Sequence, residues 1–289
     1  DGNGLRQALR IAGGCTIGFT IAKLMNWPYG IFFTVYPMLL LGLVPVISKP
    51  VIKQFIASAG FSAFIVLVLQ GLFSHIPVVM TLIVFLCFCV LFYQMSSGGG
   101  FLFGALGAVG LSIQLHFSSY ATGADTVYPL IVSNGAATLL SIVIAVFMHG
   151  IFPDVAPRTP RVPPPKAKES IRHEVLLCAS VATLSFVVFQ ALDLQDSISA
   201  QASSVLILFS LCWKAASLAG WQRAIGTLIG CNLALLAQLF LYNHSDFLLF
   251  PVLVLWILAF IFSRYHILGG GMPGIGFGVL TTFGILFGN

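Results

Sequence analysis

The chain has 289 residues, of which 58% are hydrophobic and only 7% are charged, and its formal net charge at pH 7 is +5. A soluble domain carries about 25% charged residues, so a mean hydropathy of +1.03 excludes a water-exposed globular surface. The positive charges lie in small groups between apolar runs, which excludes a basic nucleic-acid-binding face. The composition therefore predicts an all-α polytopic membrane protein.

A helix needs about 20 apolar residues to cross the hydrocarbon core of a bilayer. Eleven segments approach this length, and we expect a transmembrane helix at residues 7–25, 29–47, 53–73, 77–95, 101–119, 127–150, 172–192, 198–213, 221–242, 247–263 and 273–288. The prolines and charges of residues 152–174 indicate an aqueous linker. We divide the chain into a first transmembrane repeat (1–151), a cytoplasmic linker (152–171) and an incomplete second repeat (172–289).

The basic residues indicate the orientation of these helices. With a cytoplasmic N-terminus, twelve of the thirteen Lys and Arg residues fall on the inner side, and only Lys23 falls on the outer side. The acidic residues of the outer loops are Asp125, Asp193, Asp196 and Asp246. This distribution follows the positive-inside rule and predicts that the N-terminus is cytoplasmic.

The two halves of the chain resemble each other at a shift of about 166–171 residues. "LRQALRIAGG" (5–14) aligns with "IRHEVLLCAS" (171–180), and Lys53 aligns with Arg223. The alignment predicts two parallel pseudo-repeats of six transmembrane helices, an arrangement that many transporters share. Eleven helices are visible, and the counterpart of residues 127–150 would follow residue 289, so we expect a twelfth helix beyond that point.

Two stretches carry a family resemblance. Residues 6–45, "RQALRIAGGCTIGFTIAKLMNWPYGIFFTVYPMLLLGLVP", resemble the opening of the fusaric acid resistance and aromatic acid exporter (FUSC-like) superfamily. The shorter, transmembrane-only branch (DUF2955-like) is the most similar part of that superfamily. Residues 220–239 resemble its R-x-x-G-T-x-x-G helix, with Arg223, Gly226, Thr227 and Gly230 at the matching positions.

The resemblance implies a function. It implies efflux of small organic anions, above all aromatic carboxylic acids, from the bacterial inner membrane by alternating access, with a periplasmic adaptor (membrane fusion protein) as partner. It places the chain among proteins of multidrug resistance. Plant malate channels are similar at a greater distance, so a passive organic-anion channel stays open as an alternative, and so does a homo-oligomer.

Other classes are less favoured by the sequence. All six cysteines lie in apolar runs, and no metal cluster and no nucleophile with a base stand out. We therefore expect no enzyme activity, no cofactor and no nucleic-acid partner. A structural subunit of an envelope complex, or a membrane enzyme, remains a weaker alternative.

Polar residues within the apolar segments are the candidates for substrate binding. A proline interrupts residues 34–40, where we expect a kink or break that would expose backbone amides to an anion. The aligned residues 201–207 are unusually polar. The first predicted lining is Thr34, Tyr36, Pro37, Gln201, Ser203 and Ser204. Hydrogen bonding between helices is the alternative interpretation.

Further candidates lie elsewhere in the predicted spans. Arg10, one turn into the first span, and Arg223, at the start of the ninth, would attract anions, although both would also suit snorkelling toward lipid phosphates. Further polar residues lie within the spans, and we expect some of them at the interface between the halves: Gln114, Asn134, Asn232 and Gln238. Trp256 lies in mid-span, where it would stack on an aromatic substrate or pack against lipid.

Proton coupling has no obvious residue in the sequence. Every Asp, Glu and His maps to a loop, the linker or a helix end, including His116 near the outer side. Either the expected twelfth helix carries the proton site, or acidic residues near the outer mouth do. The candidates are Asp193, Asp196 and Asp246, for which solvated loop positions are the alternative.

Two triple-glycine segments, Gly98–Gly100 and Gly269–Gly271, recur at aligned positions. Three glycines disfavour a helix. They predict either hairpin turns or re-entrant breaks whose amides meet an anion.

Overall fold

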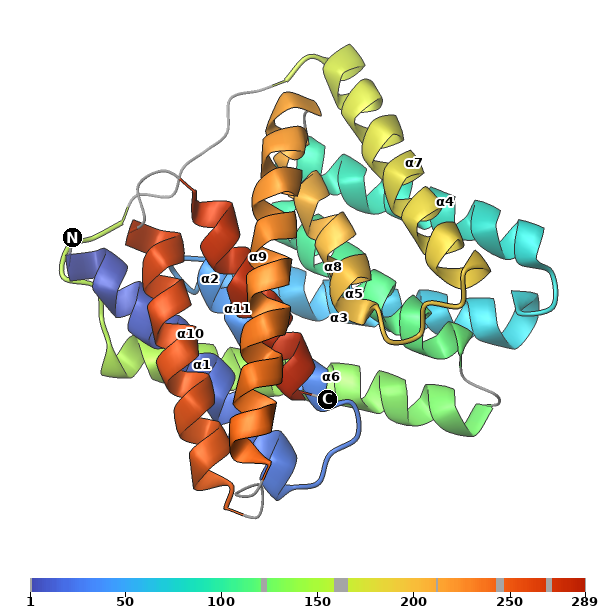
Figure 1. The fold of residues 1–289 in the computed structure, drawn as a ribbon. Helices are drawn as coiled ribbons and strands as arrows, with labels where there is room; N and C mark the ends of the chain where they lie inside the picture. Colours follow the sequence, from blue (N-terminus) through green and yellow to red (C-terminus); the bar gives the residue numbers. More distant parts are fainter. Residues whose placement is uncertain are drawn as a thin grey trace. The chain divides into compact units, whose positions relative to one another are not determined.

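The structure is a computed structural model that describes residues 2–120, 124–158, 166–211, 213–242, 247–268 and 272–288. Within these ranges every regular element is a helix (Figure 1). The helices are α1 (Gly2–Leu24), α2 (Gly30–Leu43), α3 (Lys49–Val68) with its π-helical extension η1 (Leu69–Phe73), α4 (Pro77–Ser96), α5 (Phe101–Ser119), α6 (Ala124–Ile151), α7 (Lys168–Ala191), α8 (Ile198–Ile207) with the 3-10 turn η2 (Leu208–Ser210), α9 (Trp213–Leu241), α10 (Leu249–Leu268) and α11 (Pro273–Gly288).

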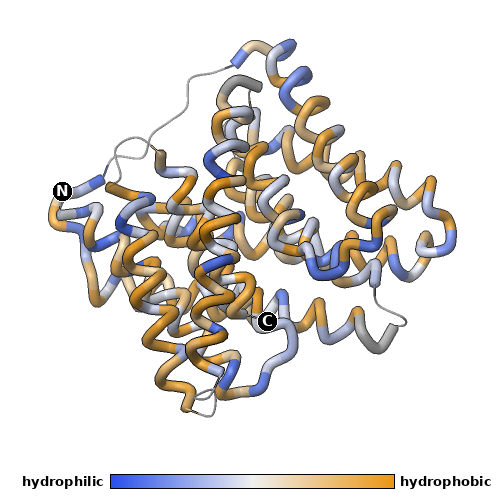
Figure 2. Tube along the Cα trace, viewed as in Figure 1, coloured by the Kyte–Doolittle hydropathy of each residue, from blue (hydrophilic) through white to orange (hydrophobic). Residues whose placement is uncertain are grey.

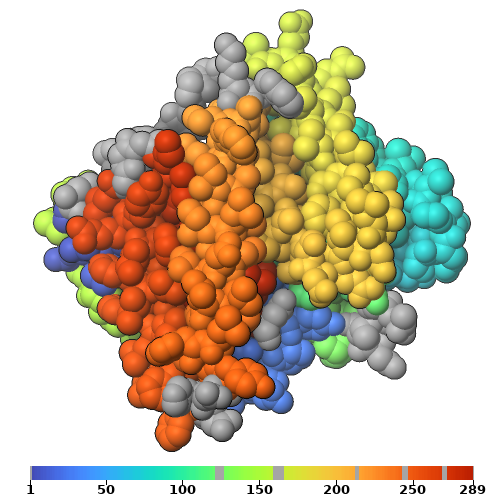
Figure 3. All heavy atoms as spheres, viewed as in Figure 1, coloured from blue at the N-terminus to red at the C-terminus, as the bar shows by residue number. Residues whose placement is uncertain are grey.

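Seven of these helices are long and apolar enough to cross a membrane, which is consistent with a polytopic membrane protein. They are α3 with η1, α4, α5, α6, α7, α9 and α10. Figure 2 shows apolar residues along almost the whole of α10, and Figure 3 shows that much of this helix lies on the surface. Apolar side chains exposed along a helix of spanning length suit contact with lipid.

The expectation of eleven full spans needs a correction. α8 has only 10 residues and α2 has 14, so at 1.5 Å per residue they are about 15 and 21 Å long. Neither covers the roughly 30 Å of a hydrocarbon core. α11, with 16 residues, is also short, and α1 does not have the hydropathy of a spanning helix.

The start of α9 also differs from the prediction. The helix begins at Trp213 and has 29 residues, whereas the sequence indicated a span starting at residue 221. Arg223 therefore lies ten residues after the first residue of α9, not at its start. At 1.5 Å per residue this is about 15 Å along the helix axis.

The chain forms two compact units. Unit 1 contains residues 1–48, 136–160 and 221–289, and unit 2 contains residues 49–135 and 161–220. α6 and α9 contribute residues to both units. Each unit thus combines helices from both predicted repeats, and the division of the chain into those repeats stays a prediction.

In unit 1, α1 packs on α2 and α10, and α11 packs on α10 and α2. The contact between α1 and α2 depends on Gly18 and Pro37. Pro37 has no N–H, so the carbonyl of Phe33, four residues earlier, has no helical donor. A Cβ at Gly18 would overlap this carbonyl oxygen. The glycine therefore lets α1 approach the backbone of α2.

α2 is continuous from Gly30 to Leu43, so the break expected at Pro37 is absent. Every residue from 31 to 41 is buried.

In unit 2, α5 packs on α3, α4 and α8, and α4 packs on α7. α5 is the central helix, since 14 of its 19 residues are buried. Gly104 and Gly107 allow this packing, because a Cβ at either position would overlap atoms of Leu91 in α4. Small residues at the contact thus allow the backbones of α4 and α5 to approach each other.

The same helix pairings occur in both units. In unit 1, α1 packs on α10 and α2 packs on α11, while in unit 2, α7 packs on α4 and α8 packs on α5. In the predicted repeat, α1 and α2 correspond to α7 and α8, and α4 and α5 correspond to α10 and α11. Each unit therefore joins the first two helices of one half to later helices of the other half.

The C-terminal caps of α1 and α7 are also equivalent. Asn26 and Asp193, 167 residues apart, both have left-handed backbone angles, with φ of 46° and 52°. In each cap the following amide donates to the carbonyl five residues earlier, at 2.9 Å after α1 and 3.0 Å after α7. This is the Schellman arrangement, which favours glycine, asparagine or aspartate at the left-handed position.

A glutamine caps α5 and α11 in the same way. The Gln54 Oε1 accepts hydrogen bonds from the backbone amides of Leu102 and Phe103, both at 3.2 Å. The Gln222 Oε1, 168 residues later in the chain, accepts one from the amide of Gly274 at 3.1 Å. Free amides in the first turn of a helix need such acceptors.

This correspondence changes one detail of the alignment. If Gln54 corresponds to Gln222, the counterpart of Arg223 is Phe55 rather than Lys53. Phe55 is buried, as Arg223 is, whereas Lys53 is exposed.

We predict that Gly18→Ala strongly destabilises unit 1, because the new Cβ would meet the Phe33 carbonyl rather than a flexible side chain. Overpacking of this kind costs about 1–3 kcal/mol. The thermal unfolding midpoint in detergent should fall clearly. Gly60→Ala is the control, since nothing lies within 4 Å of its Cβ, and an equal midpoint for the two variants would contradict the prediction.

Candidate functional site

The predicted lining from α2 lies in the interior of unit 1. Thr34 is fully buried and its hydroxyl donates to the Gly30 carbonyl at 3.4 Å. Its side chain lies against Gly284 and Gly288 of α11. The Tyr36 ring is buried 5.3 Å from the ring of Phe32. With Pro37 against α1, these residues are used in packing the helices of unit 1.

The predicted lining from α8 lies in unit 2, on two faces of the helix. Gln201 is 1% exposed and faces α5. Ser204 faces α7, where its hydroxyl lies 2.7 Å from that of Ser185. Ser203 is buried as well.

Two further predicted polar residues also lie inside unit 2. The Gln114 amide donates to the hydroxyl of Ser62 on α3 at 2.8 Å, while its Oε1 has no hydrogen-bond partner. Asn134 is fully buried and donates to the Ala59 carbonyl at 3.4 Å. Both contacts connect other helices to α3, as the helix–helix alternative expects.

The structure adds His116, which the sequence placed at a helix end. It is 1% exposed, and its Nδ1 lies 2.5 Å from the Oε1 of Gln201. Its Nε2 lies 2.7 Å from the backbone carbonyl of Gln195. The histidine therefore brings α5, α8 and the turn before α8 together.

A partly open cavity of about 550 Å³ lies near this end of unit 2. Gln70 of the π-helical turn donates to Ser118 at 3.0 Å on its wall. Gln190 and Phe186 of α7 also line it, and the Gln190 Nε2 is buried without a hydrogen-bond partner. Its size is in the range of about 300–1,000 Å³ that small-molecule pockets have.

The acidic candidates for proton coupling lie in the turn between α7 and α8. Asp193 and Asp196 are exposed, and Asp193 accepts a hydrogen bond from the Gln195 side chain at 3.1 Å. Tyr120 follows α5 and donates to the Phe189 carbonyl at 2.9 Å. Partial burial, with the nearby charge of Asp193, raises the pKa of Tyr120. Asp246 lies outside the described residues.

Arg223 is a buried cation in unit 1. It is 5% exposed, and its Nη2 donates to the Thr281 hydroxyl at 2.9 Å. Its guanidinium lies 5.3 Å from the ring centre of Phe277, which also stacks on His266 at 4.8 Å. Among the described residues no carboxylate forms an ion pair with it, and its Nε has no hydrogen-bond partner.

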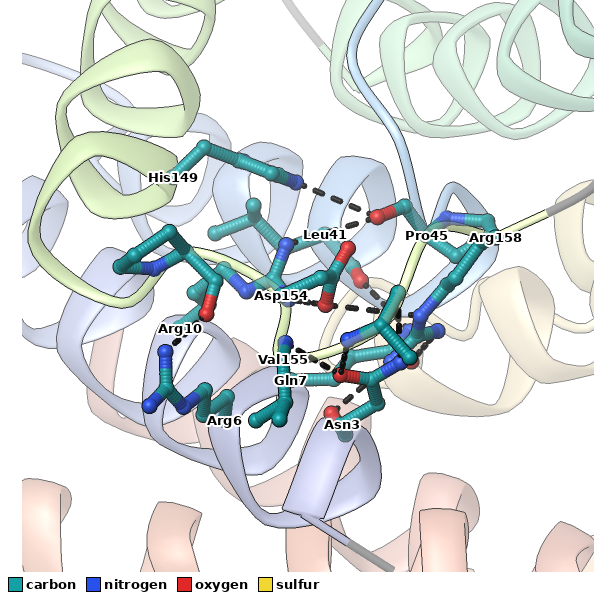
Figure 4. Close-up of polar contacts among 12 residues, drawn as sticks. Asn3, Arg6, Gln7, Arg10, Leu41, Pro45, His149, Asp154, Val155 and Arg158 are labelled. Atoms are coloured by element: carbon teal, nitrogen blue, oxygen red, sulfur yellow. Dashed lines mark hydrogen bonds and ion pairs between the residues drawn. The ribbon is translucent and has the colours of Figure 1, made fainter.

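Arg10, on α1 in unit 1, has a different environment from Arg223 (Figure 4). It is 1% exposed and forms an ion pair with Asp154, which follows α6. Its Nη1 also lies 3.4 Å from the Pro45 carbonyl after α2. Because its charge is already paired, an anionic substrate would have to compete with Asp154.

Other contacts hold the segment after α6 against α1 (Figure 4). Arg158 donates to the Gln7 side chain at 2.7 Å and to the Asn3 carbonyl at 2.8 Å. The Asn3 side chain pairs with the backbone of Val155 and Ala156, at 2.7 and 2.9 Å. The first part of the predicted linker is thus packed on α1.

Two predicted residues face outward. Asn232 is exposed on α9 and donates only to its own helix, to the Leu228 carbonyl at 2.8 Å. Trp256 is 39% exposed on α10 and stacks on Phe260, with ring centres 5.8 Å apart. The structure brings neither residue together with the other candidates of unit 1.

The first triple-glycine segment is a turn. Gly98 has a left-handed φ of 79°, and Gly100 precedes the first residue of α5. Residues 98–100 thus join α4 to α5, as the hairpin interpretation expects. Gly269–Gly271 lie outside the described residues.

We predict that Asp154→Asn destabilises the protein by about 3 kcal/mol, because it leaves the Arg10 guanidinium buried without its carboxylate. The variant should unfold at a lower temperature in detergent than Asp196→Asn, which changes an exposed acid. Replacing both partners, as R10M with D154N, should recover part of the loss. Equal unfolding of the two single variants would disprove a structural role for this ion pair.

Comparisons with known proteins yield one match. Neither a curated protein nor a solved structure matches the chain. The resemblance to the DUF2955-like branch is confirmed for residues 7–148. The wider link to the aromatic acid exporter superfamily stays a prediction. Residues 7–148 match the family described as a protein of unknown function, DUF2955.

Proposed function

We propose that the protein exports small organic anions, above all aromatic carboxylates, across the bacterial inner membrane by alternating access. The proposal includes two parallel repeats of six helices, a cytoplasmic N-terminus and a periplasmic adaptor as partner. Its support is the polytopic helical architecture and the resemblance of residues 6–45 and 220–239 to the aromatic acid exporter superfamily.

The observation that carries the proposal is the pair of short helices α2 and α8. They have 14 and 10 residues, and their positions correspond in the predicted repeat. α2 is buried throughout its centre, and seven residues of α8 are buried. Short or interrupted helices at corresponding positions are typical of the substrate pathway in transporters built from repeats.

The equivalent local structures support the internal repeat. The Schellman caps after α1 and α7 and the glutamine caps of α5 and α11 recur 167 and 168 residues apart. The packing of α1 on α10 and of α2 on α11 in unit 1 recurs in unit 2 as the packing of α7 on α4 and of α8 on α5. Unrelated halves would have no reason to share both the caps and the pairings at nearly the same shift.

Arg223 supports an anionic substrate. A buried guanidinium in an apolar helix is costly unless a negative charge accompanies it. In the described part of unit 1, its contacts are a hydroxyl and an aromatic ring rather than a carboxylate. Such a group suits a carboxylate next to an aromatic ring, because guanidinium groups bind carboxylates and stack on aromatic faces.

The test is uptake of labelled 4-hydroxybenzoate into inverted membrane vesicles with and without the protein. We expect Arg223→Gln to lower the rate by about tenfold or more, the effect of about 1.4 kcal/mol in transition-state binding. Arg264→Gln, an exposed arginine of α10, should leave the rate nearly unchanged. Arg223→Lys should retain more activity than Arg223→Gln.

Two outcomes would contradict the proposal. Equal uptake with and without the protein, over a panel of aromatic and aliphatic acids, would remove export of organic acids. Uptake that continues unchanged after the proton gradient is collapsed, and that only equalises the concentrations, would show a passive channel instead.

A further inference from the structure

His116 joins three parts of unit 2. It lies three residues before the end of α5, is almost completely buried, and contacts Gln201 in the second turn of α8 and Gln195 in the turn before it. The two distances, 2.5 Å at Nδ1 and 2.7 Å at Nε2, are those of short hydrogen bonds. One imidazole ring thus holds the beginning of α8 against α5.

Both atoms that face the ring are oxygens. The carbonyl of Gln195 can only accept a hydrogen bond, and the Gln201 amide presents its Oε1. A neutral imidazole has one N–H and can donate to only one of these oxygens, whereas an imidazolium donates to both. The geometry therefore fits the protonated ring.

The orientation of Gln201 is not free to compensate. Its Nε2 points toward the backbone carbonyl of Ser112 at 3.5 Å. If the amide turned over to donate to a neutral His116, its Oε1 would face this carbonyl, and two acceptors would oppose each other. Loss of the proton would therefore cost one of two contacts of the Gln201 amide, the one with His116 or the one with the Ser112 carbonyl.

Few charged groups face the histidine. α4, α5 and α8 carry no Asp, Glu, Lys or Arg, and the charged residues of α3 and α7, which also pack on α5, lie within the first seven residues of those helices. The turn before α8 carries Asp193 and Asp196, and Asp193 binds the side chain of Gln195. The Tyr120 ring lies 5.2 Å from the imidazole. Asp193 is thus connected to His116 through one residue and is itself exposed.

We propose that His116 is a proton-binding site and that its proton fastens α8 to α5. When the ring releases the proton to water at the exposed turn, one of the two N–H···O bonds is lost and the beginning of α8 is released from α5. This rests on the proposed function, where the step would let a proton gradient move one of the two short helices. The acids of the turn then serve as the exposed end of the proton path.

The attachment is tested by hydrogen exchange of the α8 amides in the purified protein, at an acidic pH of about 5.5 and an alkaline pH of about 8. After correction for the intrinsic exchange rate, protection of residues 198–207 should be about tenfold higher at the acidic pH, the effect of one buried hydrogen bond. Equal protection at both pH values would overturn the proposal.

Three variants test whether His116 causes the pH difference in the protection of α8. His75→Gln, at an exposed histidine before α4, should keep the pH difference. His116→Gln should abolish it. Gln201→Glu should also abolish it, but with α8 protected at both pH values, because a carboxylate would hold the imidazolium. A pH difference that persists in His116→Gln would overturn the proposal, and so would weak protection at both pH values in Gln201→Glu.

Export is measured separately, so that the two proposals can fail independently. In vesicles, an imposed proton gradient should accelerate 4-hydroxybenzoate transport in the wild type and in His75→Gln, but not in His116→Gln. If no acid is transported while the exchange results hold, the exporter fails and the proton site stands. If gradient-driven transport is normal in His116→Gln, the proton site fails and the exporter stands.

Discussion

One constraint shapes each unit: a polar group inside an apolar helical unit is costly to bury unless a neighbouring segment supplies a partner. Burial of an unpaired polar group costs several kcal/mol in an environment without water. Gly18, which has no side chain, leaves room for the Phe33 carbonyl, whose helical donor Pro37 removes. Arg10 meets Asp154, and Gln201 meets His116. Each of these contacts joins one helix to another segment, so the constraint fixes the packing of each unit.

The short helices show how this constraint creates polar sites. α8 begins where the sequence predicted a span, at Ile198, but it ends early in a 3-10 turn that is followed by a left-handed residue, Leu211. Gln201 turns to α5 and Ser204 to α7, so both polar faces are used within unit 2. Because hydrogen bonds attach α8 to α5 and α7, the loss of one of them would weaken this attachment.

The sequence predicted the helices better than their partners. Runs of apolar residues locate most spans within a few residues, because a bilayer sets their length. It did not predict that α8 is short or that α9 begins at Trp213, since an apolar run does not reveal where tertiary contacts end a helix. The pairs formed by Arg10 with Asp154 and His116 with Gln201 join residues 144 and 85 positions apart. No local pattern encodes such pairs, so polar residues could be identified as candidates but not assigned neighbours.

The two buried arginines show why neighbours decide function. Both are buried in unit 1, but Arg10 pairs with Asp154 and contacts the Pro45 carbonyl, so its charge is used to hold segments together. Arg223 contacts a threonine hydroxyl and the face of Phe277, which orient the guanidinium without cancelling its charge. An oriented and uncancelled charge attracts a counter-ion, whereas a paired one does not. Of these two residues with the same chemistry and similar burial, Arg10 has a carboxylate partner, whereas Arg223 has none among the described residues.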